Sequence, residues 1–209
     1  SDAQALSAII NYLNREREFD LKKVAGVKLA VNHYLLELIA QIKSPFAVDI
    51  ALQKRAESGN KPVIIWCKLI KTTDTVAESL DLINEQRKER GEKPFNYGIY
   101  RGDTTQKKRE LLRTSFQREG EFAPGQKYAD QALDFLIATT AMREGVTLTE
   151  ATRAVFVEFW YVPAWMSQAE DRIYRIGQTE DCEISYLFVP GTIDDKLMGM
   201  RARKMAVVS

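Results

Sequence analysis

From residue 62 onwards, short apolar segments alternate with longer amphipathic segments, and this alternation restricts the fold more than any other feature of the sequence. The apolar segments are too short for helices and mostly lack polar alternation, which is typical of strands buried on both faces. Because helical segments separate them, we predict a mostly parallel sheet flanked by helices, an α/β architecture. The predicted strands are 63–66, 95–100, 133–138, 154–159 and 183–189, and the predicted helices are 74–90, 105–118 and 164–176.

Capping residues predict where several of these helices begin and end. Thr73 and Thr192 are predicted N-caps, with Asp195 in the first turn of a last helix. Gly91 and Gly177 are predicted helix ends, because glycine adopts a left-handed backbone at little cost.

The first 60 residues follow a different pattern. Apolar residues at helical spacing predict helices at 4–18, 28–42 and 46–58, and Gly59-Asn60-Lys61-Pro62 breaks the chain. We therefore expect a helical lead-in over 1–60 and an α/β core over 61–205.

The composition describes one ordinary globular domain. The chain is 45% hydrophobic and 28% charged, with a net charge of +1. This near-neutral balance is not that of a wholly basic nucleic-acid binder, so a DNA contact would need a local patch. The sequence has no apolar run near 18 residues and no signal-peptide pattern. We therefore expect no membrane contact. The two cysteines match no metal spacing, so we expect a reducing, intracellular setting, either cytoplasmic (bacterial or phage-encoded) or nuclear.

The segment Gln168-Ala-Glu-Asp-Arg-Ile-Tyr-Arg-Ile-Gly-Gln178 carries the strongest chemical signal. On a helix, Gln168, Arg172 and Arg175 share one face at i, i+4 and i+7. Two guanidiniums one turn apart suit a multiply charged oxyanion such as a nucleotide phosphate. The alternative is a solvated helix whose arginines pair with nearby carboxylates, namely Glu170, Asp171 or Glu180.

This segment resembles the last helicase motif of Swi/Snf-type ATPases in helicase superfamily two. The resemblance implies that the whole chain, 1–209, is a RecA-like (P-loop NTPase type) second lobe. It also implies that Arg172 and Arg175 are catalytic arginine fingers that reach the γ-phosphate of ATP on a first lobe, with Gln168 on the nucleotide side.

Residues 100–104, followed by Arg109 and Phe116, resemble a family segment that touches the nucleic-acid backbone. The resemblance implies DNA contacts by Arg101, Gly102, Thr104 and Lys107. Asp103 or Thr104 is the expected cap of the next helix, whose free N–H groups would suit a phosphate. A capped, solvated and basic helix is the alternative.

Residues 138–148 resemble the fifth motif of the family, where Thr140 would contact a DNA phosphate while Glu144 and Gly145 would face the nucleotide. Met142, Arg143 and Thr147 depart from the usual pattern, which is similarly loose in the annealing-helicase branch. Lys68, after the first core strand, is a further candidate for the DNA backbone.

Two stretches have an open role. The aromatic stretch 159–165 could stack on bases, but packing at a strand–helix junction is the favoured interpretation. Residues 119–132 lack periodicity and are long for a connection in an α/β domain, so we interpret them as an insertion loop.

The sequence contains no Gly-x-x-x-x-Gly-Lys-Ser/Thr loop and no Asp-Glu-x-His box. The resemblance therefore implies that ATP and Mg²⁺ are bound mainly by a first lobe of the same polypeptide, and that this lobe supplies arginine fingers and DNA-backbone contacts to a DNA translocase. Two alternatives remain: a free-standing, non-catalytic DNA- or protein-binding module, and a lobe of a DEAD-box-type RNA helicase.

Overall fold

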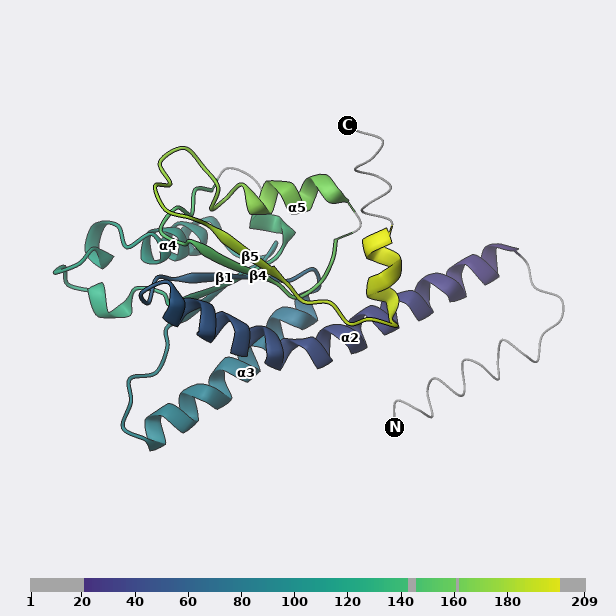
Figure 1. Ribbon diagram of the computed structural model, residues 1–209, viewed down its shortest axis with the longest axis horizontal. Helices are drawn as coiled ribbons and strands as arrows, with labels where there is room; N and C mark the ends of the chain where they lie inside the picture. The colour runs from purple at the N-terminus through teal and green to yellow at the C-terminus, as the bar shows by residue number, and fades with distance from the viewer. Residues whose placement is uncertain (1–20, 143–145, 161, 200–209) are drawn as a thin grey trace. The chain divides into compact units, whose positions relative to one another are not determined.

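A computed structural model describes residues 21–142, 146–160 and 162–199 (Figure 1). The chain forms two compact units, residues 1–36 and residues 37–209. The sheet and the helices that cover it belong to the second unit. The predicted helix at 4–18 lies outside the described residues. The α-helices are α2 (Leu21–Glu57), α3 (Ile70–Glu89), α4 (Gln106–Phe116) and α5 (Pro163–Glu170), followed by a last helical segment described below.

Five parallel strands form one sheet, in the order β2-β3-β1-β4-β5. They are β1 (Val63–Trp66), β2 (Tyr97–Tyr100), β3 (Phe135–Ala138), β4 (Arg153–Phe156) and β5 (Glu183–Tyr186). The predicted α/β fold with a parallel sheet is confirmed. Because all strands run the same way, their last residues meet at one border, which we call the carboxyl edge, and their first residues meet at the amino edge.

The sheet lies between two layers of helices. Residues 37–57 of α2 and α3 cover one face, and α4 and α5 cover the other (Figure 1). Successive strand residues point to opposite faces, so Val63 and Ile65 pack against α2 and α3. Trp66 points to the other face, where its ring lies 5.9 Å from that of Trp160. Burial on both faces explains why the central strands β1 and β3 consist of continuous apolar runs.

Helix α2 continues through Pro45, although the sequence predicts two helices here, at 28–42 and 46–58. Proline removes one helical hydrogen bond, which normally ends or kinks a helix. The residues just after it explain why the helix persists: Ala47, Val48 and Ala51 are fully buried against the sheet. Tertiary packing therefore outweighs the local penalty.

A buried ion pair joins α2 to the last helical segment, residues 193–199. The Lys43 ammonium donates to Asp194 at 2.8 Å and to the Leu187 carbonyl at 3.2 Å, and both charged side chains are nearly inaccessible to solvent. The start of this segment follows the prediction, since the Thr192 hydroxyl accepts a hydrogen bond from the Asp194 N–H. The two charges are satisfied inside the fold, as burial demands.

The starts of α3 and α4 correct two predicted caps. Helix α3 begins at Ile70, before Thr73, whose hydroxyl donates to the Ile70 carbonyl. At α4 the cap is Thr105, whose hydroxyl accepts from the Lys108 N–H, so neither Asp103 nor Thr104 has this role. The predicted end of α3 is confirmed, because Gly91 follows it with φ 71°.

Helix α4 lies unusually close to the sheet at Gly98 in β2. A Cβ atom at this position would overlap the Leu112 side chain of α4 and would press against Leu133. Glycine therefore suits this position because of close approach and not because of a turn, and a larger residue would require Leu112 to move.

The segment 119–132 contains two short 3₁₀ helices, Gly120–Phe122 and Ala129–Gln131. The Tyr128 N–H donates to the Glu121 carbonyl, which holds the segment together. The segment that the sequence predicts as an insertion loop is therefore ordered, and it lies beside the amino edge.

Candidate functional site

Helix α5 is shorter than the sequence predicts, and this changes the placement of the two motif arginines. The predicted helix 164–176 is wrong, because α5 ends at Glu170. The Gln168 carbonyl accepts from the Arg172 side-chain Nε at 2.9 Å, and the Arg172 carbonyl accepts from the Leu148 N–H at 3.0 Å. Both carbonyls would otherwise accept helical N–H groups. Gly177 has φ 102°, but it ends a run of turns and not the helix.

Arg172 and Arg175 nevertheless converge. Their Nη1 atoms lie 3.0 Å and 3.5 Å from the same acceptor, the Val146 carbonyl oxygen. Burial lowers the pKa of Arg172, and the positive charge of Arg175 lowers it further, which shows that the two cations sense each other. Two positive charges on one neutral carbonyl form a site with unbalanced charge, which favours an anion.

The alternative interpretation, ion pairing with nearby carboxylates, finds no support in the described part of the chain. Glu180 pairs with Lys61, and Glu170 accepts from the Tyr186 hydroxyl at 2.5 Å. Asp171 raises the pKa of Arg172 only as the weakest of its influences. Within the described residues, both guanidiniums donate to carbonyls.

The sequence predicted some of the residues around the two arginines and missed others. Gln168 is exposed beside the arginines, whereas Glu144 and Gly145 lie outside the described residues. Gln178, at the end of the motif, donates to the carbonyls of Thr149 and Ala151 and so fixes the turn against the loop before β4. Sequence reasoning assigned Gln178 no role and missed the Val146 carbonyl, because a backbone acceptor leaves no mark in a sequence.

Most candidate DNA-contacting residues meet at the carboxyl edge. Lys68 follows β1, Arg101 and Gly102 follow β2, and Thr140 follows β3, three strands that are neighbours in the sheet. Thr140 is half-buried at the start of a 3₁₀ turn, and Gly102 is exposed. The sheet order brings together segments that are far apart in the sequence, such as Lys68 and Thr140, as the carboxyl ends of parallel strands do in many binding sites.

The loop after β2 is held rigidly. The Thr104 hydroxyl accepts from the Arg101 N–H at 2.8 Å. Arg109 of α4 donates to the carbonyls of Thr104 and Gly102 at 2.7 and 2.9 Å, and its guanidinium lies over the Tyr100 ring. Arg101 pairs with Asp74. Arg109 therefore organises this loop, while Lys107 and Lys108 stay exposed on α4.

A buried carboxylate supports the segment after β1. Glu158 accepts from the Lys68 N–H at 2.7 Å and from the Thr72 hydroxyl at 3.0 Å. Burial raises the pKa of Glu158. Burial also lowers the pKa of Lys68 to about 8, although the Glu158 charge opposes that shift. Sequence reasoning missed Glu158 because it lies at the end of an apolar strand with no motif around it.

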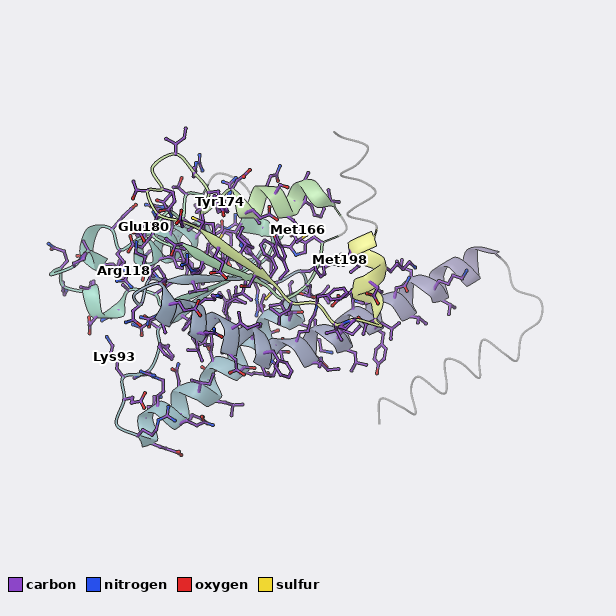
Figure 2. All side chains as sticks on the ribbon, in the orientation of Figure 1. Lys93, Arg118, Met166, Tyr174, Glu180 and Met198 are labelled. Carbon is purple, nitrogen blue, oxygen red and sulfur yellow. The ribbon has the colours of Figure 1, made fainter. Side chains whose placement is uncertain are left out.

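The first two residues of the aromatic stretch after β4 pack in the core, whereas Trp165 is exposed. Phe159 and Trp160 are almost fully buried, and the Trp160 ring lies 5.6 Å from that of Phe156. Packing is thus confirmed for these two residues. Met166 in α5 is also buried, whereas Tyr174, in the turn that carries the arginines, is exposed (Figure 2).

The described residues contain no helix long and apolar enough to cross a membrane. Nor do they bring together three or more His, Cys, Asp or Glu side chains in a way that could hold a metal ion.

A parallel α/β sheet with basic loops at its carboxyl edge and paired arginines after α5 defines a RecA-like helicase lobe. Residues 46–177, more than half of the chain, match the family model described as the helicase conserved C-terminal domain. The chain belongs to this family, as a Swi/Snf-type C-terminal lobe of helicase superfamily two.

Two curated relatives support the Swi/Snf assignment. The chain is 26% identical over 208 residues to the SWI/SNF-related matrix-associated actin-dependent regulator of chromatin subfamily A-like protein 1 of Xenopus laevis, which covers 100% of the chain and 17% of that protein. It is 42% identical over 72 residues to the DNA annealing helicase and endonuclease ZRANB3 of Bos taurus, over 34% of the chain and 7% of the relative. The chain thus spans a small part of both proteins, and the second match agrees with the annealing-helicase branch.

Two solved structures share the fold. The C-terminal part of the Fun30 ATPase domain superposes with a TM-score of 0.56 at 20% identity, over 72% of this chain and 42% of that one. The Hef helicase domain of Pyrococcus furiosus gives a TM-score of 0.51 at 18% identity, over 75% and 27%.

Proposed function

We propose that this chain, over its whole length, is the second motor lobe of an ATP-dependent DNA translocase. The observation that carries the proposal is the convergence of Arg172 and Arg175 on one backbone carbonyl. A guanidinium held by a neutral acceptor keeps its charge for another partner, whereas one held by a carboxylate does not. Family membership supports phosphate as that partner.

In this mechanism, Arg172 and Arg175 act when the two lobes close. Negative charge spreads over the phosphoryl oxygens in the transition state, and planar, pre-positioned guanidiniums stabilise it. Gln168, Glu144 and Gly145 would lie on the nucleotide side of the same surface. Mg²⁺ would be held mainly by ligands on the first lobe, because the sequence of this chain contains no Asp-Glu-x-His box.

The carboxyl edge would hold the DNA backbone. Thr140 and Gly102 offer a hydroxyl and a close backbone approach, and Thr104, Lys68 and Lys107 surround them with donors and positive charge. Arg101 would join them by exchanging its exposed partner Asp74 for a phosphate. Such contacts read phosphates and not sequence. The relatives named above are eukaryotic DNA or chromatin proteins by name, so we expect an intracellular and nuclear setting, and a bacterial or phage origin has no support among them.

The test compares this chain alone with a longer polypeptide that contains its first lobe. The 209-residue chain should show no ATP turnover above blank with or without duplex DNA, because the phosphate loop is absent from its sequence. The longer polypeptide should show turnover that duplex DNA stimulates. DNA-stimulated hydrolysis by the 209-residue chain alone would contradict the proposed division between two lobes.

A further inference from the structure

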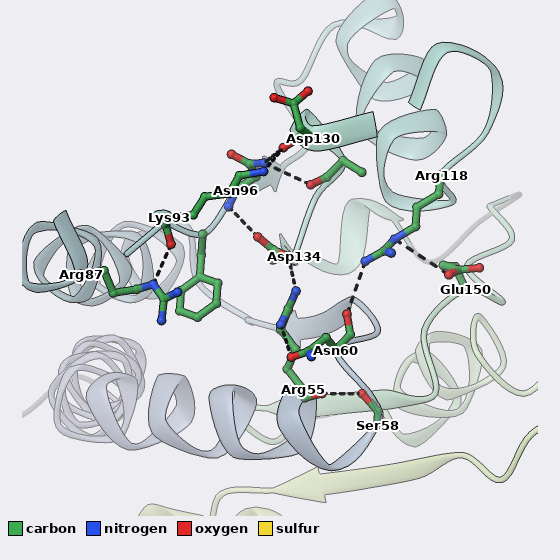
Figure 3. Close-up of polar contacts among 12 residues, drawn as sticks. Arg55, Ser58, Asn60, Arg87, Lys93, Asn96, Arg118, Asp130, Asp134 and Glu150 are labelled. Carbon is green, nitrogen blue, oxygen red and sulfur yellow. Dashed lines mark hydrogen bonds and ion pairs between the residues drawn. The ribbon is translucent and has the colours of Figure 1, made fainter. Parts of the chain in front are cut away.

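A polar cavity of about 380 Å³ lies at the amino edge of the sheet, the border opposite the candidate DNA contacts (Figure 3). Its lining comes from the end of α2 and the turn after it, the end of α3, the residues before β2, the residues just after α4, the segment 119–132 and the residue before β3. Its volume falls within the range of small-ligand pockets. The polar and charged residues that line it are Arg55, Asn60, Arg87, Lys93, Asn96, Arg118, Asp130 and Asp134.

Asn60 connects two of the cationic side chains. Its side-chain oxygen accepts from Arg55 at 2.7 Å, and its carbonyl accepts from Arg118 at 3.4 Å. Arg55 also donates to Asp134 at 2.5 Å, and the second oxygen of Asp134 accepts from the Asn96 N–H. These bonds fix the floor of the cavity before any ligand enters, which lowers the cost of binding.

A third guanidinium is fixed on the opposite side of the floor. The Phe95 ring has Arg87 at 4.1 Å and Arg55 at 5.5 Å from its centre. Arg87 also donates to the Lys93 carbonyl. The Lys93 ammonium donates to the Asp130 carbonyl, so the segment 119–132 supplies part of the wall.

Two of the four cationic side chains that line the cavity are balanced by carboxylates, Arg55 by Asp134 and Arg87 by Glu92 at 2.8 Å. The other two are Lys93 and Arg118. Figure 3 shows the Asp130 carboxylate directed away from Asp134 and Asn60. Lys93 therefore faces a carbonyl and not a carboxylate, and it keeps its charge for a ligand.

Arg118 is the least satisfied of these cations. Its hydrogen bond to Asn60 is long, and its Nε lies 3.9 Å from Glu150, the outer limit of an ion pair. That Nε is shielded from solvent and makes no hydrogen bond to a described residue. A buried donor without an acceptor destabilises the fold, and a ligand oxygen would satisfy it.

The backbone conformation of Arg118 is a second sign that its side chain has a role here. Arg118 has φ 54° and follows the cap residue of α4, where its N–H donates to the Ser115 carbonyl and the next N–H donates to Thr114. This left-handed position after a helix normally belongs to glycine. Arginine is less stable than glycine in this backbone conformation. Its presence is explained if the guanidinium has a role in the cavity.

We propose that this cavity binds the phosphate group of an anionic ligand, with Arg118 and Lys93 as its principal cationic ligands. The segment 119–132, which has no assigned role in the motor, then serves as a wall of a second site. The proposal does not depend on the motor function, since the cavity shares no residue with the arginine pair or with the DNA-contacting loops.

The experiment titrates pyrophosphate into the 209-residue chain by calorimetry at low salt. Arg118→Gly should weaken binding about tenfold or more, the loss of one charge-assisted hydrogen bond. Because glycine suits the left-handed backbone, this variant should melt no lower than the parent chain, which separates binding from folding. Lys93→Gln should also weaken binding. Lys88→Gln, an exposed lysine on the last turn of α3 that does not line the cavity, is the control and should bind normally.

A short duplex DNA distinguishes the two sources of phosphate. If the ligand is a free anion, the duplex will not displace pyrophosphate from the Arg118 site. If it is a nucleic-acid phosphate, the duplex will displace it, and Arg118→Gly will weaken duplex binding as well. Either result supports the phosphate site. The proposal is overturned if pyrophosphate shows no saturable binding, or if Arg118→Gly and Lys88→Gln bind it equally well.

Discussion

Arg113 in α4 and Arg172 after α5 are both partly exposed arginines, yet their surroundings are opposite. Arg113 lies 2.8 Å from Glu110 and 2.7 Å from Glu119, and these carboxylates, Glu110 first, raise its pKa. Arg172 donates to two carbonyls, and burial together with the charge of Arg175 lowers its pKa.

The difference teaches how to separate structural from functional arginines. A guanidinium between carboxylates is neutralised and stays where it is. A guanidinium between carbonyls is positioned but not neutralised, so a phosphate can still supply its counter-charge. The predictions below test this distinction.

The largest effect is expected from Arg175→Ala in a polypeptide that contains both lobes. Arginine fingers contribute about 10³ to 10⁵ in rate, or roughly 4–7 kcal/mol of barrier. ATP turnover should fall by that factor while ATP affinity and thermal midpoint change far less. Arg175→Lys should restore little, because an ammonium lacks the planar fork, and Arg172→Ala should behave like Arg175→Ala in a milder form.

Arg113→Ala is the matched control for this comparison. Its charge is already balanced, so turnover should stay near normal. Near-normal turnover in Arg175→Ala would remove the finger assignment, and a collapse in Arg113→Ala would break the distinction between the two kinds of arginine.

The next largest effect concerns Lys43, a fully balanced cation in the core. Asp194→Ala leaves its ammonium buried without a counter-charge, which should lower the free energy of unfolding by about 3–5 kcal/mol. Chemical denaturation measures this. Asp195→Ala, at the exposed neighbour, should cost much less, and the double change Lys43→Met with Asp194→Leu should recover most of the loss. A single variant as stable as the parent chain would show that the pair is not held as described.

A smaller effect is expected at the carboxyl edge. Lys107→Glu with Lys108→Glu should weaken duplex DNA binding for every sequence alike, and the slope of log affinity against log salt should fall by about 0.9 per lost contact. Lys88→Glu with Arg90→Glu, at the other border of the sheet, provides the control. Equal losses in both pairs would mean that only net charge matters.

The smallest effect is a pH dependence at Lys68. Its pKa of about 8 means that its charge disappears as the pH rises from 7 to 9, so DNA affinity should fall over this interval. Lys68→Gln should bind as the parent chain does at pH 9, with no further loss. The unfolded chain holds this proton more tightly, so between about pH 8 and 10.5 the contribution of Lys68 to folding stability rises with pH. A parent chain whose DNA affinity falls no more than that of Lys68→Gln would exclude a contact by Lys68.

Sequence patterns predicted the strands and α4 well because their causes are local. Val63–Trp66 is an apolar run between breakers, and Gly91 ends α3 through its own backbone. The predicted length of α5 failed because its end depends on Leu148 and Val146, which lie more than 20 residues upstream. Helical periodicity continues through residue 176, and nothing in the motif shows that the Arg172 side chain takes a helical carbonyl.

The same contrast holds for the candidate sites. The motif arginines could be found because guanidiniums at fixed spacing form a pattern. Glu158 and Arg118 could not, since one is a lone carboxylate at a strand end and the other an ordinary basic residue after a helix. Their roles arise only when the sheet order brings distant segments together.

Because Gly98 has no side chain, Leu112 of α4 can pack directly against the backbone of β2. Helix α4 packs on β2 at this point, with the loop 101–105 before its first turn and Arg118 after its last turn. A methyl group at position 98 would force the Leu112 side chain to move, so the packing of α4 on β2 would have to readjust between these two borders of the sheet.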